Sequence, residues 1–376
     1  MVSMTTEVMQ VDPQRASLDV IRGAGDALAR GRLVAFPTET VYGVAARADH
    51  PEAIARLREL KSREGGKAFT VHIASREDIR NFVDPVPGLV NRFVRKGWPG
   101  PLTLIINVPD PLTTPISRNR SDLTVNAIYY DNSVGLRCPD DVIATGMLRA
   151  AGGPVVAASA NLAGNPPPTT GAEVRRDLDG RIDLLIDAGR TKYAKPSTIV
   201  RINAPSYELV REGVLDAGVI ERLGTLRILF VCTGNTCRSV MAAALAARLI
   251  ADRLGCEISD LAKHGIIVRS AGTSGGVGGA NRHAITVMQR RGLNVAGHSS
   301  TLLTVDMIQQ ADHVFAMTSA HQERILEMVP SAQDRVARLI ESEDLSDPLG
   351  GTEDDYARSA GAIEEALRTR LAEMDL

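Results

Sequence analysis

Residues 226–249, LRILFVCTGNTCRSVMAAALAARL, carry the strongest local signal in the sequence. Arg227–Val231 is rich in β-branched and aromatic residues and predicts a buried strand, whereas the alanines and leucines of residues 242–249 predict a helix. Residues 232–238 must then form the turn that leads from the strand to the helix N-terminus. Backbone N–H groups and the helix dipole meet at such a turn, so it predicts a binding site for a phosphate or another oxyanion.

The side chains of this turn are suited to cysteine chemistry on a bound anion. Cys232 opens the turn, where the helix N-terminus and the guanidinium of Arg238 favour the nucleophilic thiolate. Arg238 can donate two hydrogen bonds to one phosphate group. Gly234 and Asn235 tolerate positive φ, and Ser239 can cap the helix or hydrogen-bond the thiolate. The alternative is a buried cysteine in an ordinary strand-to-helix turn.

Val231–Ser239, VCTGNTCRS, resembles the phosphate loop of the low-molecular-weight protein tyrosine phosphatases. The resemblance continues to the C-terminus through three further segments, Val268–Gly272, Ala311–Thr318 and Asp347–Gly351. It implies that Cys232 is the nucleophile, that Arg238 holds the oxyanion, and that Asp347, in an Asp-Pro pair, is the general acid. The residues that it implies as supports of the phosphate are Thr233, Gly234, Asn235, Thr236, Cys237 and Ser239. It implies no cofactor.

Two features of this segment resemble the protein arginine phosphatase branch of the family. Thr236 stands where tyrosine-specific members usually carry an aliphatic residue, and Leu349-Gly350-Gly351, without an aromatic ring, follows the acid. Phosphotyrosine remains an alternative substrate. An arsenate reductase is a second alternative, but it needs resolving cysteines downstream, and no cysteine follows Cys256. Cys237 is a candidate for a protective or regulatory disulfide with Cys232.

The composition limits the other classes of function. A chain of 376 residues predicts two or three domains, and 43 basic against 45 acidic residues give a net charge of −2, which is not typical of a nucleic-acid binder. Four irregularly spaced cysteines favour neither a disulfide framework nor a zinc site, so we predict no metal site and a reducing cytoplasm. We expect neither a signal peptide nor a membrane span, and no contact with a membrane.

The N-terminal half places polar residues after short strands, where α/β proteins commonly bind ligands. A strand over residues 33–36 leads into PTETVYG, which contains Thr38, and a helix over residues 51–60 leads into Lys61-Ser62-Arg63. His72 lies in a strand over residues 68–73. A strand over residues 155–158 leads into Ser159-Ala160-Asn161. Further strands are predicted at residues 102–108, 134–137, 182–186, 197–202 and 209–212. The polar region 109–133 is predicted to be irregular, and it is where a mobile loop could cover a site.

In this order, the segments resemble the threonylcarbamoyl-AMP synthase family, which has the YrdC-like fold. The resemblance covers about residues 16–213 and implies a twisted, open α/β sheet with a positively lined concave face. It implies the condensation of L-threonine, bicarbonate and ATP, the last accompanied by Mg²⁺, with release of pyrophosphate. The product feeds the tRNA modification machinery that makes threonylcarbamoyladenosine. The residues implied for threonine are Thr38, His72, Arg137 and Thr198. Those implied for ATP are Lys61, Arg63, Ser159, Asn161 and Arg211.

The sequence therefore predicts a fusion enzyme of class α/β. We expect a synthase domain over residues 13–213, a linker over 214–225, and a phosphatase domain over 226–376 that acts on a phosphorylated protein through a phosphocysteine intermediate. In the second domain, strands alternate with helices at 239–254, 281–291, 319–329 and 353–373, which predicts a doubly wound, four-stranded parallel sheet. The alternative for the first domain is a module that binds RNA or nucleotide without synthase activity.

Overall fold

The structure is a computed structural model that describes residues 5–13, 15, 17–62, 67–274, 277–374 and 376. The chain forms two compact units, Met1–Gly224 and Thr225–Leu376, and each unit is described here by itself. Among the helices of the described residues, none is both long and apolar enough to cross a membrane.

Within the described part of the first unit, eleven strands form one sheet in the order β1-β9-β2-β3-β8-β4-β7-β5-β10-β11, with β6 paired to β7. The strands are β1 (Glu7–Gln10), β2 (Val34–Phe36), β3 (Gly43–Arg47), β4 (Thr70–His72), β5 (Leu102–Asn107), β6 (Tyr129–Tyr130), β7 (Ser133–Arg137), β8 (Val155–Ser159), β9 (Leu184–Asp187), β10 (Thr198–Asn203) and β11 (Ser206–Arg211). Parallel and antiparallel pairs both occur, so the sheet is mixed.

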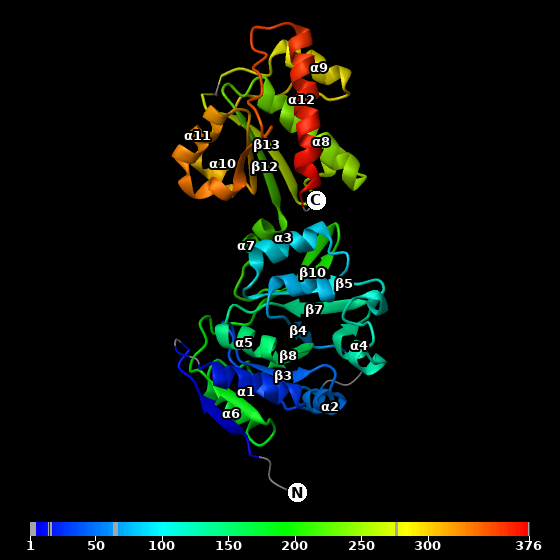
Figure 1. The fold of residues 1–376 in the computed structure, drawn as a ribbon, viewed down its shortest axis with the longest axis vertical. Coiled ribbons are helices and arrows are strands. Elements are labelled where there is room, and N and C mark those ends of the chain that lie inside the picture. The colour runs from blue at the N-terminus through cyan, green and yellow to red at the C-terminus, as the bar shows by residue number, and fades with distance from the viewer. Residues whose placement is uncertain (1–4, 14, 16, 63–66, 275–276, 375) are drawn as a thin grey trace. The chain divides into compact units, whose positions relative to one another are not determined.

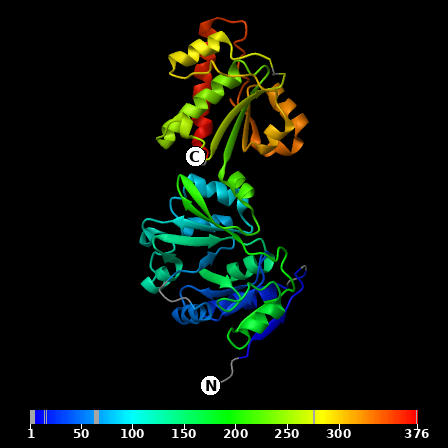
Figure 2. The same cartoon turned by 180° about the vertical axis from the view of Figure 1, so that it is seen from behind.

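The helices of the first unit cover both faces of this sheet (Figure 1; Figure 2). They are α1 (Leu18–Ala29), α2 (Pro51–Leu60), α3 (Gly88–Gly97), α4 (Asp122–Ile128), α5 (Val142–Ala150), α6 (Gly171–Leu178) and α7 (Ala217–Gly224), with 3-10 helices η1 (Arg76–Asn81) and η2 (Pro111–Thr113). Helices α1 and α5 pack together because Gly25 has no side chain, since a Cβ atom there would lie 2.4 Å from the Cβ of Ala150. Their apolar residues form a core separate from the larger one on the other face.

Two predictions about the first unit differ from the structure. Residues 109–133 are not a loop, because they contain η2, α4 and β6. Asp110 is the N-cap of η2, and Ser121 is the N-cap of α4. The segment predicted as a linker contains α7, and it packs on α3 with Ile220 buried in the core. Both helices are only seven or eight residues long. The apolar periodicity of a helix is weak over so few residues, so the sequence did not mark them.

The second unit is a doubly wound parallel sheet in the order β13-β12-β14-β15. Its elements are β12 (Leu226–Cys232), α8 (Arg238–Leu254), η3 (Ile258–Asp260), β13 (Ile266–Gly272), α9 (Arg282–Arg290), α10 (Val305–Gln310), β14 (His313–Ala316), α11 (Ser319–Met328), η4 (Pro330–Arg335), β15 (Val336–Arg338) and α12 (Glu353–Ala372). Helices α8, α9 and α12 cover one face and α10 and α11 the other (Figure 1). The predicted fold class is confirmed in both units.

Strand β12 explains why the turn after it is held firmly. Ile228 and Phe230 point into the core beneath α8 and α12, whereas Leu229 and Val231 point into the core on the other face. A strand buried on both faces and flanked by β13 and β14 cannot shift without disrupting both cores. Cys232, its last residue, therefore occupies a fixed position at the carboxyl edge of the sheet.

Candidate active sites

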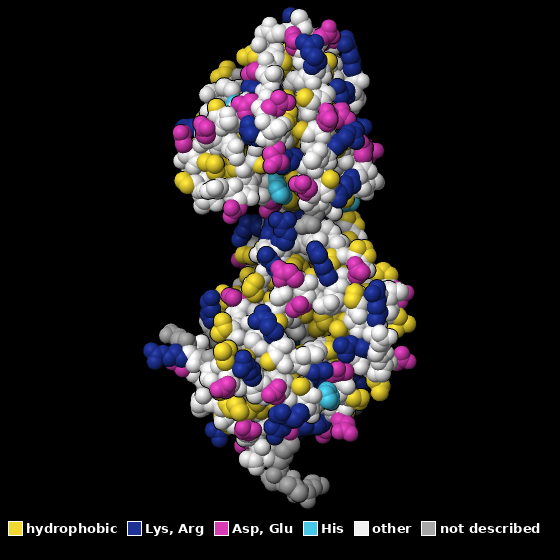
Figure 3. Space-filling model, in the orientation of Figure 1, with side chains coloured by type: hydrophobic (Ala, Val, Ile, Leu, Met, Phe, Trp, Pro, Cys, Tyr) yellow, Lys and Arg dark blue, Asp and Glu magenta, His cyan; other side chains and the backbone are white. Residues whose placement is uncertain are grey.

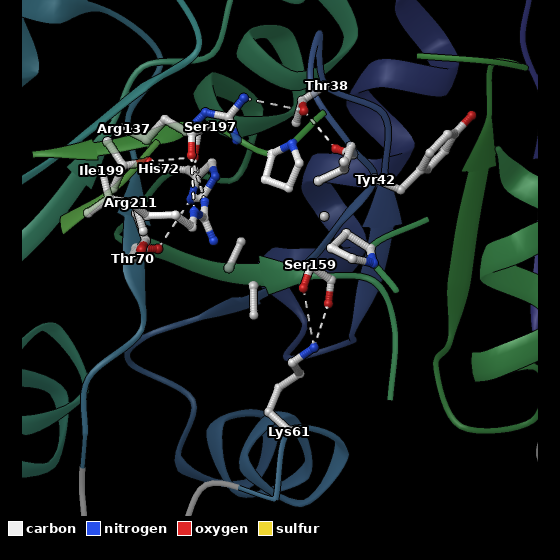
Figure 4. A pocket seen from close by; sticks show the side chains of 17 residues that line it. Thr38, Tyr42, Lys61, Thr70, His72, Arg137, Ser159, Ser197, Ile199 and Arg211 are labelled. Atoms are coloured by element: carbon white, nitrogen blue, oxygen red, sulfur yellow. Dashed lines mark hydrogen bonds between the residues drawn. The ribbon is translucent and has the colours of Figure 1, made fainter. Parts of the chain in front are cut away.

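A cavity of about 210 Å³ lies in the first unit. Its walls are formed by strands of the sheet and by the turns beside them, namely β3, β4, β5, β7, β8, β10 and β11. It brings together six of the nine residues predicted to bind threonine or ATP, namely Thr38, Lys61, His72, Arg137, Ser159 and Arg211 (Figure 4). Its lining contains three cations and neither Asp nor Glu among the described residues. The cavity therefore favours an anionic ligand.

Arg137 is held at this cavity by buried oxygen atoms of the turn after β2. Its Nη2 atom donates to Thr40 Oγ1 at 2.6 Å, to Glu39 Oε1 at 2.9 Å and to Thr38 Oγ1 at 3.4 Å. Arg137 and Glu39 are both buried, so the pair forms an ion pair away from water. Removal of either partner alone would leave an uncompensated buried charge. Glu39 thus fixes the guanidinium that faces the cavity.

His72 contributes a neutral imidazole to the cavity. Burial, and then the positive charge of Arg137, lowers the pKa of His72 to about 3. Its Nδ1 atom lies 3.2 Å from the carbonyl oxygen of Thr70, and this contact requires a proton on Nδ1. The ring of Phe36 packs against the imidazole edge-to-face at 6.0 Å. At neutral pH the second ring nitrogen, Nε2, can therefore accept one hydrogen bond from a ligand, and the imidazole adds no charge.

The end of α2 directs Lys61 towards the turn after β8. Its Nζ atom donates to Ser159 O at 3.0 Å (Figure 4). It also donates to Asn161 O at 2.8 Å and to Asn161 Oδ1 at 3.0 Å. Asn161 is buried and does not line the cavity. It therefore positions Lys61 in this structure and makes no contact surface for a ligand.

Arg211 reaches the cavity from β11 and is oriented by Ser197. Its Nη2 atom donates to Ser197 O at 2.7 Å, and Thr103 Oγ1 lies 3.0 Å from Ser197 Oγ. Burial, and then the charge of Arg137, lowers the pKa of Arg211, although an arginine remains protonated. Two guanidinium groups that repel each other would be stabilised by an anion between them.

Besides Asn161, one further described residue predicted for this site, Thr198, does not line the cavity. Thr198 is fully buried, and its hydroxyl donates to the carbonyl oxygen of Leu215 at 2.7 Å and accepts from the N–H groups of Gly213 and Leu215. The prediction that it binds threonine is therefore replaced by a structural role at the end of β11. Arg63 lies outside the described residues.

In the second unit, the carbonyl oxygens of residues 232–236 all accept hydrogen bonds from groups outside the turn, at 2.8 to 2.9 Å. The donors are the backbone N–H groups of Thr273, Ser274 and Asn281 and the side chains of His298 and Ser300. In a planar trans peptide, the C=O and the following N–H point in opposite directions. The N–H groups of residues 233–237 therefore face the inside of the turn, and none has an acceptor among the described residues.

Asn235 holds the middle of this turn in a left-handed conformation, with φ of 53°. Its fully buried side chain donates to Ser239 Oγ at 3.0 Å and to Ser270 Oγ at 2.8 Å, and accepts from Thr301 N at 2.8 Å. Gly272 allows the turn to lie against β13, because a Cβ atom there would be 2.5 Å from the carbonyl oxygen of Thr233.

The three predicted catalytic residues of the second unit surround this turn. Cys232 Sγ lies 3.0 Å from Ser239 Oγ, so the hydroxyl can stabilise a thiolate by donating to it. Arg238 Nη2 donates to Asp347 Oδ2 at 2.6 Å, while Nη1 donates to the carbonyl oxygen of Leu345 at 3.1 Å. Arg238 is buried, whereas the side chain of Asp347 is 43% exposed. The carboxylate can therefore leave the guanidinium when an anion takes its place.

Neighbouring groups fix both ends of the turn. His321 Nε2 lies 2.9 Å from Thr233 Oγ1, and burial, followed by the charge of Arg238, lowers the pKa of His321. Cys237 Sγ lies 3.2 Å from Tyr356 Oη, and burial, followed by this contact, raises the pKa of Tyr356. Both Cys232 and Cys237 are free thiols in the structure. The disulfide between them stays a prediction.

Several residues that build these sites carry no signal in the sequence that marks their role. Glu39 lies in the PTETVYG turn, but its ion pair with Arg137 joins residues 98 positions apart. His298 and Ser300, from the segment before α10, and His321, from α11, support the phosphate-loop turn, and no local signal marks them. Among the described residues, no cluster of three or more His, Cys, Asp or Glu is placed to hold a metal ion.

Comparisons with known proteins agree with this division of the chain. The Sua5–YciO–YrdC family model, described as "Telomere recombination", matches residues 26–213. The model described as "Low molecular weight phosphotyrosine protein phosphatase" matches residues 227–375.

Curated relatives and a solved structure match as well. The threonylcarbamoyl-AMP synthase of Bacillus subtilis is 34% identical over a match that covers 58% of this chain. The same match covers only 59% of that relative's own length. The threonylcarbamoyl-AMP synthase of Chromohalobacter salexigens is 34% identical over 48% of this chain and 91% of its own length. The structure of Pyrococcus abyssi Sua5 complexed with L-threonine has a TM-score of 0.51 at 22% identity, over 96% of this chain and 98% of that one, and so supports the fold alone.

The packing of Gly272 predicts the effect of a single methyl group on anion binding. Gly272→Ala should push the turn away from β13, lower the free energy of unfolding by about 1–3 kcal/mol and weaken the binding of inorganic phosphate about tenfold. Gly361→Ala is the matched control, because a Cβ atom there meets nothing within 4 Å. Isothermal titration with phosphate measures the effect. Equal affinities for both variants would contradict the packing argument.

The neutral state of His72 predicts a pH dependence. An unfolded histidine takes up a proton near pH 6.5, whereas folded His72 does so only near pH 3, so the first unit loses stability as the pH falls through this window. From pH 6.5 to 5 the loss is about 2 kcal/mol per such group. Urea unfolding followed by the fluorescence of Trp98, the single tryptophan of the chain, measures it. If the free energy of unfolding of a His72→Gln variant falls with decreasing pH as steeply as that of the wild type, His72 is not the group responsible.

Proposed function

This chain belongs to the Sua5–YciO–YrdC family and carries a low molecular weight phosphotyrosine protein phosphatase domain after it, and from this premise we propose that it is a bifunctional enzyme. The first activity makes threonylcarbamoyl-AMP from L-threonine, bicarbonate and ATP. The second hydrolyses a phosphorylated protein through a phosphocysteine intermediate. We assign residues 13–213 to the synthase domain, 214–225 to the connection and 226–376 to the phosphatase domain.

The observation that supports the synthase proposal is the cavity in which Arg137, Arg211 and Lys61 meet a neutral His72. The amine of threonine condenses with bicarbonate to a carbamate, with loss of water. A carbamate oxygen then attacks the α-phosphorus of ATP, and the bond to pyrophosphate breaks. This reaction needs no protein nucleophile, because fixed cations and hydrogen-bond donors can orient the reactants and stabilise the charge that develops on phosphate.

Magnesium would reach the synthase site with the nucleotide. The described lining of the cavity contains neither Asp nor Glu, so the residues present do not fit a metal held by the protein. When bound to ATP, the ion neutralises phosphate charge. We assign Thr38, His72 and Arg137 to threonine, and Lys61, Ser159 and Arg211 to ATP. Arg63 remains a candidate for ATP on the family resemblance.

The observation that supports the phosphatase proposal is the set of inward N–H groups that surrounds Cys232. The thiolate of Cys232 attacks phosphorus, forming a sulfur–phosphorus bond, while the bond to the leaving group breaks and Asp347 supplies its proton. Water then attacks the phosphorus, Asp347 takes the proton of that water, the sulfur–phosphorus bond breaks to return the Cys232 thiolate, and inorganic phosphate leaves. Arg238 and the N–H groups of residues 233–237 hold the phosphoryl oxygens throughout.

We infer that phosphoarginine is the preferred substrate of the second activity. Thr236 places a hydroxyl in the turn, and the side chain of Leu349, which follows the proposed acid, is 66% exposed and offers no ring to stack on tyrosine. The partner of this activity is a phosphorylated protein. The partner of the first is the tRNA modification machinery that consumes threonylcarbamoyl-AMP. Four unpaired cysteines are compatible with the reducing cytoplasm.

Separation of the two activities tests the bifunctional proposal. Cys232→Ala removes the nucleophile and should lower phosphatase turnover more than about a thousandfold, while threonine-dependent release of pyrophosphate from ATP stays at the wild-type rate. Cys256→Ala is the control, because this thiol lies outside the turn and should leave both rates unchanged. Loss of both activities in Cys232→Ala would contradict two independent sites. If the wild-type chain releases no pyrophosphate in response to threonine, the first domain is better explained as a module that binds RNA or nucleotide without synthase activity.

Substrate preference tests the role of Thr236. The wild-type chain should hydrolyse phosphoarginine peptides with a higher kcat/KM than phosphotyrosine peptides. Thr236→Val keeps the shape of the side chain but removes its hydroxyl. It should lower kcat/KM for phosphoarginine about tenfold, the effect of one lost hydrogen bond, and leave the value for phosphotyrosine nearly unchanged. Equal losses on both substrates, or a wild-type preference for phosphotyrosine, would refute the assignment.

A further inference from the structure

The region around η2, α4 and β6 exposes large apolar side chains that take no part in either of the two sites described above. Leu112 is 65% exposed, Leu123 is 64% exposed and Tyr130 is 44% exposed. No residue of 109–133 lines the 210 Å³ cavity of the first unit. Figure 3 shows hydrophobic side chains gathered on the face around α4. Exposed apolar residues that cluster in this way mark a contact surface more often than isolated ones do.

These side chains border two hollows that share a wall. The first, of about 550 Å³, is lined by Leu112, Val125 and Tyr129 together with the prolines at 109 and 111. The second, of about 450 Å³, lies between α2 and α4 and is lined by Leu123 and Ile54. Tyr130 and Asn126 belong to both. Together they form the α4 groove, which has room for several apolar side chains of a partner.

The charge of the α4 groove is acidic. Asp110, Asp122 and Asp131 line the first hollow, and its described lining contains neither Lys nor Arg. No ion pair of these three carboxylates is found among the described residues. The only cation in the described lining of the second hollow is Arg58. The groove therefore attracts a cationic ligand and repels nucleic acid, whose phosphates are negative.

The floor of the groove is rigid before a partner binds. The buried Tyr129 donates its hydroxyl to Phe82 O at 2.9 Å and contacts Thr114 Oγ1 at 3.0 Å. Ser121 caps α4. Asp131 and Asn132, both with positive φ, form the tight turn that joins β6 to β7. A preformed surface loses little conformational entropy when it binds, so even a short peptide segment can be held there.

We propose that the α4 groove docks a basic, amphipathic segment of a partner protein, with apolar side chains in the two hollows and Lys or Arg against Asp110, Asp122 and Asp131. The exposed apolar residues supply contact area, and the three carboxylates select a cationic segment and reject an acidic one. This proposal does not depend on either catalytic activity.

Two synthetic peptides test this proposal on the full chain. Both are twelve-residue helical peptides with tryptophan and leucine on one face. The other face carries lysine in the first peptide and glutamate in the second. Methyl NMR should show that the lysine peptide shifts Leu112, Leu123 and Val125, while the glutamate peptide does not. The triple variant Asp110→Asn, Asp122→Asn, Asp131→Asn should bind the lysine peptide about tenfold more weakly, because three exposed ion pairs are lost.

The control triple is Asp179→Asn, Asp252→Asn, Asp334→Asn, which removes the same charge from exposed positions outside the groove. It should keep the wild-type affinity. Asparagine at 110 can still cap η2, so unchanged methyl signals elsewhere will show that the fold is intact. Equal binding of both peptides, or shifts centred outside the groove, would overturn the proposal. So would Leu123 signals that move with protein concentration alone, since the occupant would then be a second copy of the chain.

Discussion

The planar peptide groups of residues 232–237 are the constraint on which the second site depends. Once His298, Ser300 and three backbone N–H groups bind the carbonyl oxygens from outside, peptide geometry turns the opposite N–H groups inward. Buried N–H groups need an acceptor, so this turn is built for an anion before one arrives. In the cavity of the first unit, side chains rather than peptide groups are fixed in advance. Glu39 holds Arg137, and Ser197 holds Arg211.

The two sites use fixed donors for different chemistry. In the second unit, a thiol lies inside the ring of donors, so a bound phosphoryl group meets a nucleophile with Asp347 close to Arg238. In the first unit, no cysteine lines the described cavity, and its cations and neutral imidazole suit the positioning of substrates that react with one another. Each set of residues lies within one compact unit, which is why the proposal treats the activities as separable.

The sequence was informative where a site is local. The phosphate-loop turn, its strand and its helix lie within 24 consecutive residues, and all of them were predicted because propensity, glycine position and chemistry agree there. Glu39, His298 and His321 were missed because each acts through a contact between distant segments. Thr198 was misplaced because a strand alternates its side chains between two faces, and the motif alone does not say which face meets the cavity. Helices α4 and α7 were missed because they are short.

The most direct measurement of the central claim is an amide and guanidinium NMR titration of the full chain with orthovanadate, a phosphate analogue. If preset donors define the second site, the N–H signals of residues 233–237 and the side-chain signals of Arg238 shift together along one saturation curve, and any shift of Arg137 and Arg211 follows a separate curve. If the N–H signals stay in place while vanadate binds elsewhere, the inward N–H groups are not an anion site and the account of this half of the molecule fails.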